Sequence, residues 1–258
     1  MTALPVLITG ASGGIGADLA RIFAAKGHPL ALAARNRTAM ESLANELESS
    51  GGRKPVIIAL DLAIPDAPGL LADALKAEGF EPAILINNAG YGLNGRVSAL
   101  DSGEQLGIID LNIRALTALT LKFLPSIEKS HGRILNVAST AAFLPGPGMA
   151  IYYASKAYVL SFSQALSQEM EGRNVTVTAL CPGPTATGFF DRVGGHTAKL
   201  KKFGMMDAMT VAQAGYDGLM AGRRVVVPGM MNKVMTSLMP FVPRKLLLRV
   251  MARIQMGK

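Results

Sequence analysis

The strongest constraint on the fold of this 258-residue chain is an alternation of short apolar runs with longer helical patterns. The runs are apolar throughout rather than at every second residue, which is typical of a parallel sheet covered by helices on both faces. Six runs occupy residues 4–9, 29–34, 55–60, 83–87, 133–138 and 175–180. Helical patterns fill residues 15–26, 38–49, 68–78, 101–128 and 151–171, and a helix over about 210–220 precedes a short seventh strand at 224–227. This order predicts a single doubly wound parallel α/β sheet of about seven strands, with right-handed crossovers.

No linker or internal repeat divides the chain. We therefore expect one main domain over residues 1–228 and a helical extension over 229–258 that is not an independent domain. In a doubly wound sheet, ligands bind beyond the carboxyl ends of the strands. The residues that follow each strand are therefore the candidates for chemistry.

A glycine-rich turn, TGASGGIG, follows the first strand from Thr9 to Gly16. Glycine permits a tight turn and a close approach of the backbone to a phosphate, and the helix that follows points its free N–H groups at the same place. A bare strand-to-helix turn is the simpler alternative, but the position between a buried strand and a helix favours a dinucleotide site. The expected contacts come from Gly10, Ser12, Gly13, Gly14, Ile15 and Gly16.

The end of the second strand predicts which nicotinamide cofactor is preferred. An NAD site normally has a carboxylate there to accept from the ribose 2′-hydroxyl. This chain has Ala34 instead, followed by Arg35, whose guanidinium suits a 2′-phosphate. The sequence therefore favours NADP(H), with NAD(H) as the alternative. In a competing interpretation, Arg35 and the nearby Arg37 are merely solvated surface charges.

Side chains with the spacing of an acid–base site follow the fifth strand. Ser139 comes first, and Tyr152 and Lys156, four positions apart, share one face of a helix. A nearby ammonium favours a phenolate, so we expect Lys156 to lower the pKa of Tyr152. We expect Tyr152 to exchange a proton with a carbonyl or alcohol oxygen of the substrate, and Ser139 to hydrogen-bond that oxygen. We expect Lys156 also to hold the nicotinamide ribose. Asn112 is expected to anchor a water that relays protons through Lys156. Tyr153 is three positions from Lys156 and is expected in the core or the pocket wall.

Together these motifs resemble the short-chain dehydrogenase/reductase family. They are TGASGGIG, NNAG at residues 87–90, Ser139, YxxxK and the PG at Pro182, in register over about residues 4–190. The resemblance implies a Rossmann fold that moves hydride between a nicotinamide cofactor and a carbonyl or alcohol. It implies a catalytic set of Ser139, Tyr152, Lys156 and Asn112. It also implies cofactor contacts from Asp61, Leu62, Asn87, Ala89, Gly90, Tyr152, Lys156, Pro182, Gly183, Thr185 and Thr187.

The chain departs from the family pattern at two places. NADP-linked members often have a basic residue before the second glycine of the motif, where this chain has Gly13, so Arg35 would hold the 2′-phosphate more alone. Many members end soon after the last strand with a segment that builds a tetramer, whereas this chain continues. A tetramer is therefore in doubt, and we expect a homodimer across the fourth and fifth helices.

The substrate side is expected in the segment 188–207, which matches the family's mobile lid. No acidic or paired basic group in these loops indicates a charged substrate. A mostly apolar ketone, or a 3-oxoacyl or steroid-like compound, is therefore favoured. Candidate pocket walls, each equally compatible with a place in the core, are Tyr91, Leu93, Phe143, Met149, Phe189 and Phe190.

The C-terminal segment carries the whole excess of positive charge. Of the chain's 26 Lys and Arg residues, eight lie in residues 222–258, which contain no Asp or Glu. In the stretch 244–256, Leu247, Val250, Met251 and Ile254 would share one helical face, apart from the basic side chains. A Met-rich lid packed on the protein or on a partner subunit, with its basic face in solvent, is favoured over a helix lying on an anionic membrane.

The rest of the composition argues against several classes of protein, namely disulfide-rich, metal-binding, nucleic-acid-binding and membrane-spanning ones. There is one Cys, and no Cys/His cluster has metal-ligand spacing, so we expect neither a disulfide framework nor a metal. Trp is absent and aromatics are few, so nucleic-acid binding is not expected. No apolar run approaches the ~20 residues that span a bilayer, and residues 1–8 lack a basic leader, so we expect a cytoplasmic protein.

The sequence thus predicts an NADPH-dependent carbonyl reductase, working on a small-molecule ketone or, in reverse, a secondary alcohol. An NAD-linked alcohol dehydrogenase running in the oxidative direction is one alternative. A nicotinamide-binding redox sensor without turnover is another, which the complete acid–base set argues against.

Overall fold

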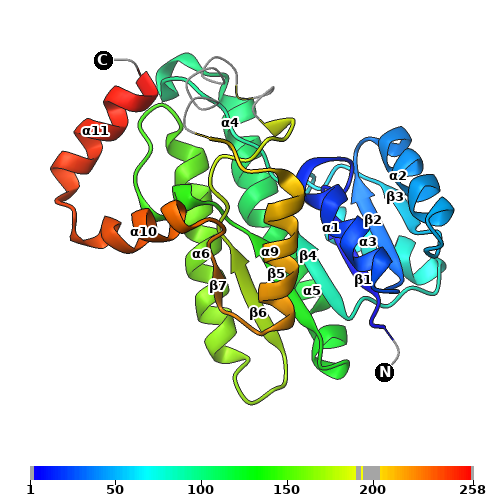
Figure 1. The fold of residues 1–258 in the computed structure, drawn as a ribbon. Coiled ribbons are helices and arrows are strands. Elements are labelled where there is room, and N and C mark those ends of the chain that lie inside the picture. Colours follow the sequence, from blue (N-terminus) through cyan, green and yellow to red (C-terminus); the bar gives the residue numbers. More distant parts are fainter. Residues whose placement is uncertain (1–2, 190–192, 194–203, 257–258) are drawn as a thin grey trace.

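The computed structural model describes residues 3–189, 193 and 204–256. Its centre is a seven-stranded, wholly parallel sheet in the order β3-β2-β1-β4-β5-β6-β7 (Figure 1). The strands are β1 (Val6–Thr9), β2 (Leu30–Ala34), β3 (Val56–Ala59), β4 (Ile84–Asn87), β5 (Arg133–Val137), β6 (Thr176–Leu180) and β7 (Val225–Val226). The predicted doubly wound fold and its seven strands are confirmed.

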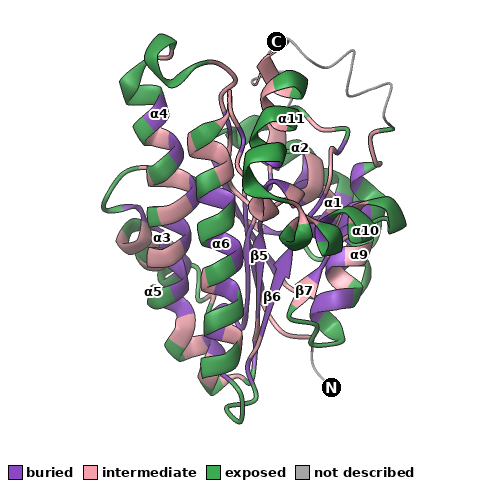
Figure 2. Ribbon diagram, turned by 90° about the vertical axis from the view of Figure 1, so that its left-hand side faces the viewer, coloured by how far each residue is buried: buried purple, intermediate pink, exposed green. Residues whose placement is uncertain are grey.

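Helices cover both faces of the sheet (Figure 2). On one face lie α1 (Gly14–Ala25), α2 (Arg37–Ser49) and α9 (Ala208–Met220). On the other lie α3 (Ala67–Ala77), α5 (Leu116–Lys129) and α6 (Ala150–Glu169). Every residue of β1, β2 and β4 is buried, which explains why these strands are apolar without alternation.

The N-termini of the helices differ in whether a side chain caps them. Asn36, Asp101 and Asp207 cap α2, α4 (Ser102–Ile109) and α9 through side-chain oxygens that accept backbone N–H bonds. Helix α1 has Gly13 at its N-cap and no side-chain cap, as α3 and α6 also lack one, but the start of α1 is the one that follows the glycine-rich turn. Its first N–H groups therefore remain available to an anion.

The sheet has its switch point at β1. This strand pairs with β2 on one side and with β4 on the other, so the chain order reverses there. The turn after β1 and the residue after β4 therefore open the crevice in which a doubly wound sheet binds ligands.

Two regions differ from the predicted elements. The stretch 101–128, predicted as one helix, is divided into α4, the π-helical turn η2 (Asp110–Ala115) and α5. After β7 the predicted helical extension forms two helices rather than only the one placed at 244–256: α10 (Met230–Leu238), then η4 (Met239–Phe241) and α11 (Arg244–Met256). The short 3₁₀ helices η1 (Val97–Ala99) and η3 (Thr140–Phe143) complete the described elements.

Candidate active site

The glycine-rich turn is built by close backbone contacts between β1, α1 and the end of β4. A Cβ at Gly16 would lie 2.4 Å from the carbonyl oxygen of Gly10 and 2.5 Å from Nδ2 of Asn88, so no larger residue fits there. Gly10 has a positive φ of 64°, which favours glycine. Asn88 donates to the carbonyl oxygens of Thr9 and Gly10 at 3.0 and 3.1 Å. These bonds hold the turn in place beside β4.

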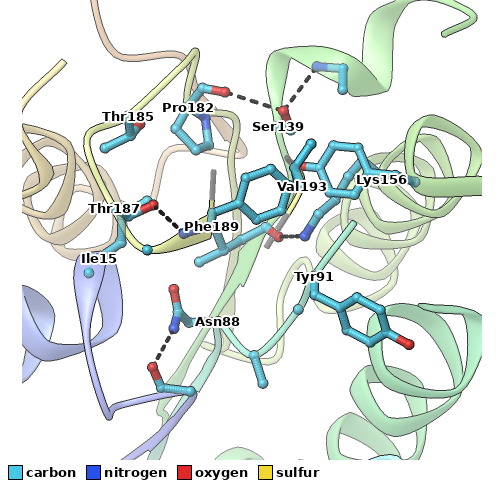
Figure 3. Close-up of a pocket in the computed structure, with 18 of the residues that line it drawn as sticks. Ile15, Asn88, Tyr91, Ser139, Lys156, Pro182, Thr185, Thr187, Phe189 and Val193 are labelled. Atoms are coloured by element: carbon cyan, nitrogen blue, oxygen red, sulfur yellow. Dashed lines mark hydrogen bonds between the residues drawn. The ribbon is translucent and has the colours of Figure 1, made fainter. Parts of the chain in front are cut away.

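A single cavity of about 780 Å³ runs from this turn across the carboxyl ends of the central strands (Figure 3). It brings together most residues that the sequence predicted for a cofactor and for catalysis. Those lining it are Gly10, Ser12, Gly13, Gly14, Ile15, Arg35, Asp61, Leu62, Ala89, Gly90, Ser139, Tyr152, Lys156, Pro182, Gly183, Thr185 and Thr187.

Several predicted site residues lie elsewhere. Asn87 points into the core, where its Nδ2 donates to Thr120 Oγ1 at 3.0 Å and to Asn136 Oδ1 at 2.9 Å, and its neighbour Asn88 lines the cavity instead. Gly16 lies beneath the turn rather than on the cavity wall. Leu93 lines a separate small pocket.

Two aromatic candidates also depart from the expected wall. Phe143 packs on a core cluster beside β5 and β6. Phe190 lies outside the described residues, as does most of the predicted lid.

The two arginines after β2 have different surroundings. Arg35 is exposed and lines the cavity, and no carboxylate of the described residues lies within 4.0 Å of its guanidinium. Arg37 begins α2 and pairs with Glu41 at 3.6 Å. Only Arg35 is therefore placed to meet a phosphate in the cavity.

Ser139, Tyr152 and Lys156 meet in the same cavity, from the end of β5 and from α6. The Ser139 hydroxyl accepts from the backbone N–H of Ala141 at 3.1 Å and donates to the carbonyl oxygen of Pro182 at 3.4 Å. The Lys156 ammonium lies 5.8 Å from the centre of the Tyr152 ring and donates to the carbonyl oxygen of Val137 at 2.8 Å. The predicted trio is thus assembled, with Lys156 held by the backbone of β5.

The electrostatics of the site differ from the predicted ones. Burial raises the pKa of Tyr152 to about 12, although the hydrogen bond from Ser139 opposes the rise. Burial lowers the pKa of Lys156 to about 8. The expectation that the pKa of Tyr152 is lowered is therefore wrong for the protein alone, because desolvation dominates and the Lys156 ammonium sits beside the ring rather than on the hydroxyl.

Asn112 sits in the π-helical turn η2 and is fully engaged with the protein. Its Oδ1 accepts from the N–H of Tyr91 at 3.1 Å, and its Nδ2 donates to the Tyr91 carbonyl and to Ser155 Oγ, both at 3.0 Å. Asn112 does not line the cavity. The side chain of Asn112 is a clamp that fixes the backbone after β4 against α6, and a Cβ at Gly90 would lie 2.9 Å from its Oδ1. The expected role of Asn112 in anchoring a water stays a prediction.

The substrate end of the cavity has an aromatic and apolar wall. The Phe189 ring lies 5.2 Å from that of Tyr152, and Met149 lines the cavity nearby. The backbone of Tyr91 borders the cavity, but its hydroxyl donates to the carbonyl of Glu104, and its ring points away from Ser139 (Figure 3). Phe189 and Met149 thus supply the side-chain wall that was expected of the aromatic candidates, whereas Tyr91 contributes mainly its backbone.

The end of α11 closes this part of the cavity. The sequence favoured a lid packed on the protein or on a partner subunit, but it did not predict that this helix borders the substrate end of the cavity. Arg253, Ile254 and Gln255 line the cavity, and Gln255 donates from Nε2 to the hydroxyl of Tyr153. Tyr153 is the pocket-wall residue that the sequence allowed for. No local signal marks Gln255, because only the path of the chain after β7 brings it to α6.

The ends of the predicted lid are tied together at its base. Thr185 and Met206 form a parallel bridge, in which Ala186 N–H donates to the Met206 carbonyl and Met206 N–H donates to the Pro184 carbonyl, both at 2.9 Å. Asn232 of α10 fills the space beside Gly183, where a Cβ would lie 2.5 Å from its Nδ2. The wall beside Pro182 and Gly183 is thereby fixed from two sides.

The residues present fit a nicotinamide dinucleotide. The uncapped start of α1 offers N–H groups to a pyrophosphate, and the glycine turn leaves room for one. Asp61, Leu62 and Arg35 line the end of the cavity suited to an adenosine, and Tyr152, Lys156 and Thr187 line the end suited to a nicotinamide riboside. Such a cofactor supplies or accepts a hydride when bound.

Comparison with known proteins agrees with this site. The family model for short chain dehydrogenases matches residues 5–197. A sulfoacetaldehyde reductase of Chromohalobacter salexigens is 40% identical over 199 residues, covering 75% of this chain and 77% of that protein.

Solved structures are similar over nearly the whole chain. A short-chain dehydrogenase from Sphingobium yanoikuyae, in complex with NADPH, is 32% identical with a TM-score of 0.79, covering 93% of this chain and 97% of that one. A bulky-bulky ketone specific alcohol dehydrogenase from Comamonas testosteroni is 28% identical with a TM-score of 0.78, covering 95% and 96%.

The chain belongs to the short-chain dehydrogenase/reductase family. It is an NAD(P)-dependent oxidoreductase that acts on alcohol or carbonyl groups. Within the described residues, no helix is both long and apolar enough to cross a membrane.

Proposed function

We propose that this enzyme reduces a mostly apolar ketone to a secondary alcohol with NADPH, and that Tyr152 is the proton donor. The observation that carries the proposal is the single cavity, which holds Arg35 at one end and the trio Ser139, Tyr152 and Lys156 at the other. A dinucleotide lying along the glycine turn would reach from Arg35 to these three side chains.

The surroundings of Arg35 support NADPH as the preferred cofactor. The side chain at position 34 is a methyl group rather than a carboxylate, so nothing there repels a 2′-phosphate. The guanidinium of Arg35 faces the cavity without a carboxylate from the described residues within 4.0 Å. The Sphingobium yanoikuyae relative is described in complex with NADPH.

The proposed chemistry follows from the protonation states. With its pKa raised to about 12, Tyr152 carries its proton at neutral pH and can donate it from Oη to the carbonyl oxygen. The hydride enters at the carbonyl carbon, the C=O π bond breaks, and the proton from Tyr152 completes the alcohol. Ser139 hydrogen-bonds the same oxygen and orients it, and the charge on Lys156 stabilises the phenolate left behind.

The wall of the substrate end supports an apolar substrate. Phe189, Met149 and Ile254 line it, and its polar members are the hydrogen-bonded pair of Tyr153 and Gln255 together with Arg253 at the end of α11. The Comamonas testosteroni relative is described as specific for bulky-bulky ketones, which supports a ketone with substituents on both sides. A short anionic aldehyde, as the name of the Chromohalobacter salexigens relative would suggest, is the second class to test.

The test is cofactor consumption by the purified enzyme with aryl alkyl ketones, steroid ketones, 3-oxoacyl thioesters and sulfoacetaldehyde. We expect turnover of a bulky ketone with NADPH well above that with NADH. Arg35→Ala should lower kcat/KM for NADPH roughly 10- to 100-fold and leave NADH unchanged, because one charge-assisted hydrogen bond is lost.

Arg37→Ala is the matched control and should behave as wild type, because Arg37 pairs with Glu41 outside the cavity. Equal losses in both variants, or a wild-type preference for NADH, would contradict the assignment of the cofactor. If the enzyme binds NADPH but turns over none of the ketones, the proposed substrate class, a mostly apolar ketone, is contradicted.

A further inference from the structure

We propose that α10, η4 and α11 form a docking surface for an anionic lipid bilayer. This surface, called the C-terminal face below, is defined by its exposed apolar side chains, Met230, Met231, Val234, Leu238, Phe241, Leu246 and Val250, with the basic side chains Lys233, Lys245 and Arg249. The two helices and the turn between them lie together at one side of the molecule (Figure 1).

The first observation is that α10 presents its apolar side outward. Met230, Met231, Val234 and Leu238 recur at helical spacing and are all exposed, with Met230 and Met231 each 74% exposed. The inward side of the same helix is polar. Asn232 donates to the Pro228 carbonyl at 2.8 Å, and Thr236 is buried and donates to the Asn232 carbonyl at 2.9 Å. A helix that packs on its own core does the reverse.

The second observation is that the exposed apolar side chains continue beyond α10. Phe241 in η4 is 83% exposed. In α11, Leu246, Val250 and Ile254 form an exposed row at four-residue spacing. This corrects the expected packing face of α11, because Leu247 is buried and Met251 half-buried, whereas Val250 is exposed and Ile254, although 58% exposed, borders the mouth of the cavity. Such clustering is unlike the scattered apolar residues of an ordinary surface.

The third observation is the charge that accompanies the apolar rows. Lys245, Arg249 and Arg253 follow the same four-residue spacing along α11, and all three are exposed. The segment 222–258 contains no Asp or Glu, and none of these cations has a carboxylate of the described residues within 4.0 Å. An apolar row beside a basic row is the pattern of a helix that lies in a membrane interface.

Charge also decides between a bilayer and a second copy of the chain. A two-fold dimer through the C-terminal face would bring the same basic rows together, with no acidic side chain in the segment to neutralise them. An anionic bilayer accepts the basic side chains at its headgroups and the apolar side chains at the boundary of its acyl chains. At about 14 and 20 Å, α10 and α11 are suited to lie along that boundary.

The experiment is flotation of the full-length protein with vesicles of equal parts phosphatidylcholine and phosphatidylglycerol, and separately with pure phosphatidylcholine vesicles. We expect binding to the anionic vesicles that weakens as salt is added, and little binding to the neutral ones. Lys233→Gln/Lys245→Gln/Arg249→Gln should weaken binding roughly 100-fold. Lys26→Gln/Arg53→Gln/Lys76→Gln removes the same charge from exposed positions outside the C-terminal face and should bind as wild type.

The apolar contribution has its own pair of variants. Met231→Ser/Phe241→Ser should lower binding at least tenfold, whereas Ile64→Ser/Leu70→Ser, which removes two exposed apolar side chains elsewhere, should not. Circular dichroism confirms folding of each variant, and light scattering after gel filtration reports its oligomeric state. Failure of the wild type to float with anionic vesicles would overturn the proposal. So would dissociation of an oligomer by Met231→Ser/Phe241→Ser, because the C-terminal face would then be an interface between copies.

Discussion

The side-chain amide of Gln255 in α11 donates a hydrogen bond to the phenolic oxygen of Tyr153 in α6, joining residues that lie 102 positions apart. The ring of Tyr153 lies 6.0 Å from that of Tyr152. The end of the chain is thereby fixed one residue from the proposed proton donor. The C-terminal helix is thus part of the wall of the candidate active site.

Gln255→Ala should therefore affect the substrate more than the cofactor. Losing one hydrogen bond and part of the wall costs about 1 kcal/mol, so we expect KM for the ketone to rise about fivefold. The Kd of NADPH, measured by fluorescence titration, should stay the same, since Gln255 lies at the other end of the cavity from Arg35. Gln213→Ala, an exposed glutamine bonded to Asp217 in α9, is the control. A matching rise in KM for that variant would argue against a local effect.

Gly13→Arg should strengthen the preference for NADPH. A Cβ at Gly13 would meet no atom within 4 Å, and its φ of 175° is extended backbone that any residue adopts. A second cation beside Arg35 should raise the ratio of kcat/KM for NADPH over NADH about tenfold. Gly13→Leu adds bulk without charge and should leave the ratio unchanged. The same rise with leucine would show that charge is not the cause.

Phe189 should control the size of the substrate, because its ring packs against Tyr152. Phe189→Ala opens space next to the reacting carbonyl, so kcat/KM for a diaryl ketone relative to acetone should rise roughly tenfold. Phe189→Tyr keeps the ring and should keep the wild-type ratio. If Phe189→Ala leaves the ratio unchanged, the ring does not border the substrate.

The pKa of Lys156 predicts how stability depends on pH. The value of about 8 lies below the ordinary 10.5, so between these pH values the folded protein binds fewer protons at this site than the unfolded chain. Stability contributed by the site therefore rises with pH across this window. Relative to Lys156→Met, the wild type should gain about 2 kcal/mol of unfolding free energy between pH 7 and pH 10.

Urea unfolding followed by circular dichroism at both pH values measures this gain. Tyr152, whose raised pKa lowers stability only above its ordinary pKa of 10.0, does not interfere in that range. Lys122→Met, an exposed position, should show no such dependence on pH. If the difference in unfolding free energy between wild type and Lys156→Met is the same at pH 7 and pH 10, Lys156 has the same pKa in the folded and unfolded states.

The sheet could be predicted from the sequence because burial on both faces leaves a local signature, the continuous apolar run. The interruption of the helix at Asn112 could not, since the apolar pattern of residues 101–128 continues through the π-helical turn. The two neighbouring residues Asn87 and Asn88 illustrate the same limit. Successive side chains on a strand point to opposite faces, so only the structure shows which of the two reaches the cavity.

The properties that depend on distant segments were also missed. The pKa of Tyr152 depends on how completely the walls of the cavity exclude water, which no spacing in the sequence reveals. An amphipathic pattern usually predicts that the apolar side of a helix packs on the core. The apolar side of α10 instead points outward. The inward side is instead polar, because Asn232 fills the space beside Gly183 and Thr236 is buried.

The most direct test of the proposed mechanism is a single-turnover measurement of hydride transfer from NADPH to the best ketone of the panel, by stopped-flow absorbance. Tyr152→Phe should slow the step roughly 100- to 10,000-fold while NADPH still binds, because the proton donor is lost and the ring remains. Tyr153→Phe, the adjacent phenol, should stay within about fivefold of wild type. A Tyr152→Phe enzyme that transfers hydride at the wild-type rate would contradict the assignment of Tyr152 as the proton donor.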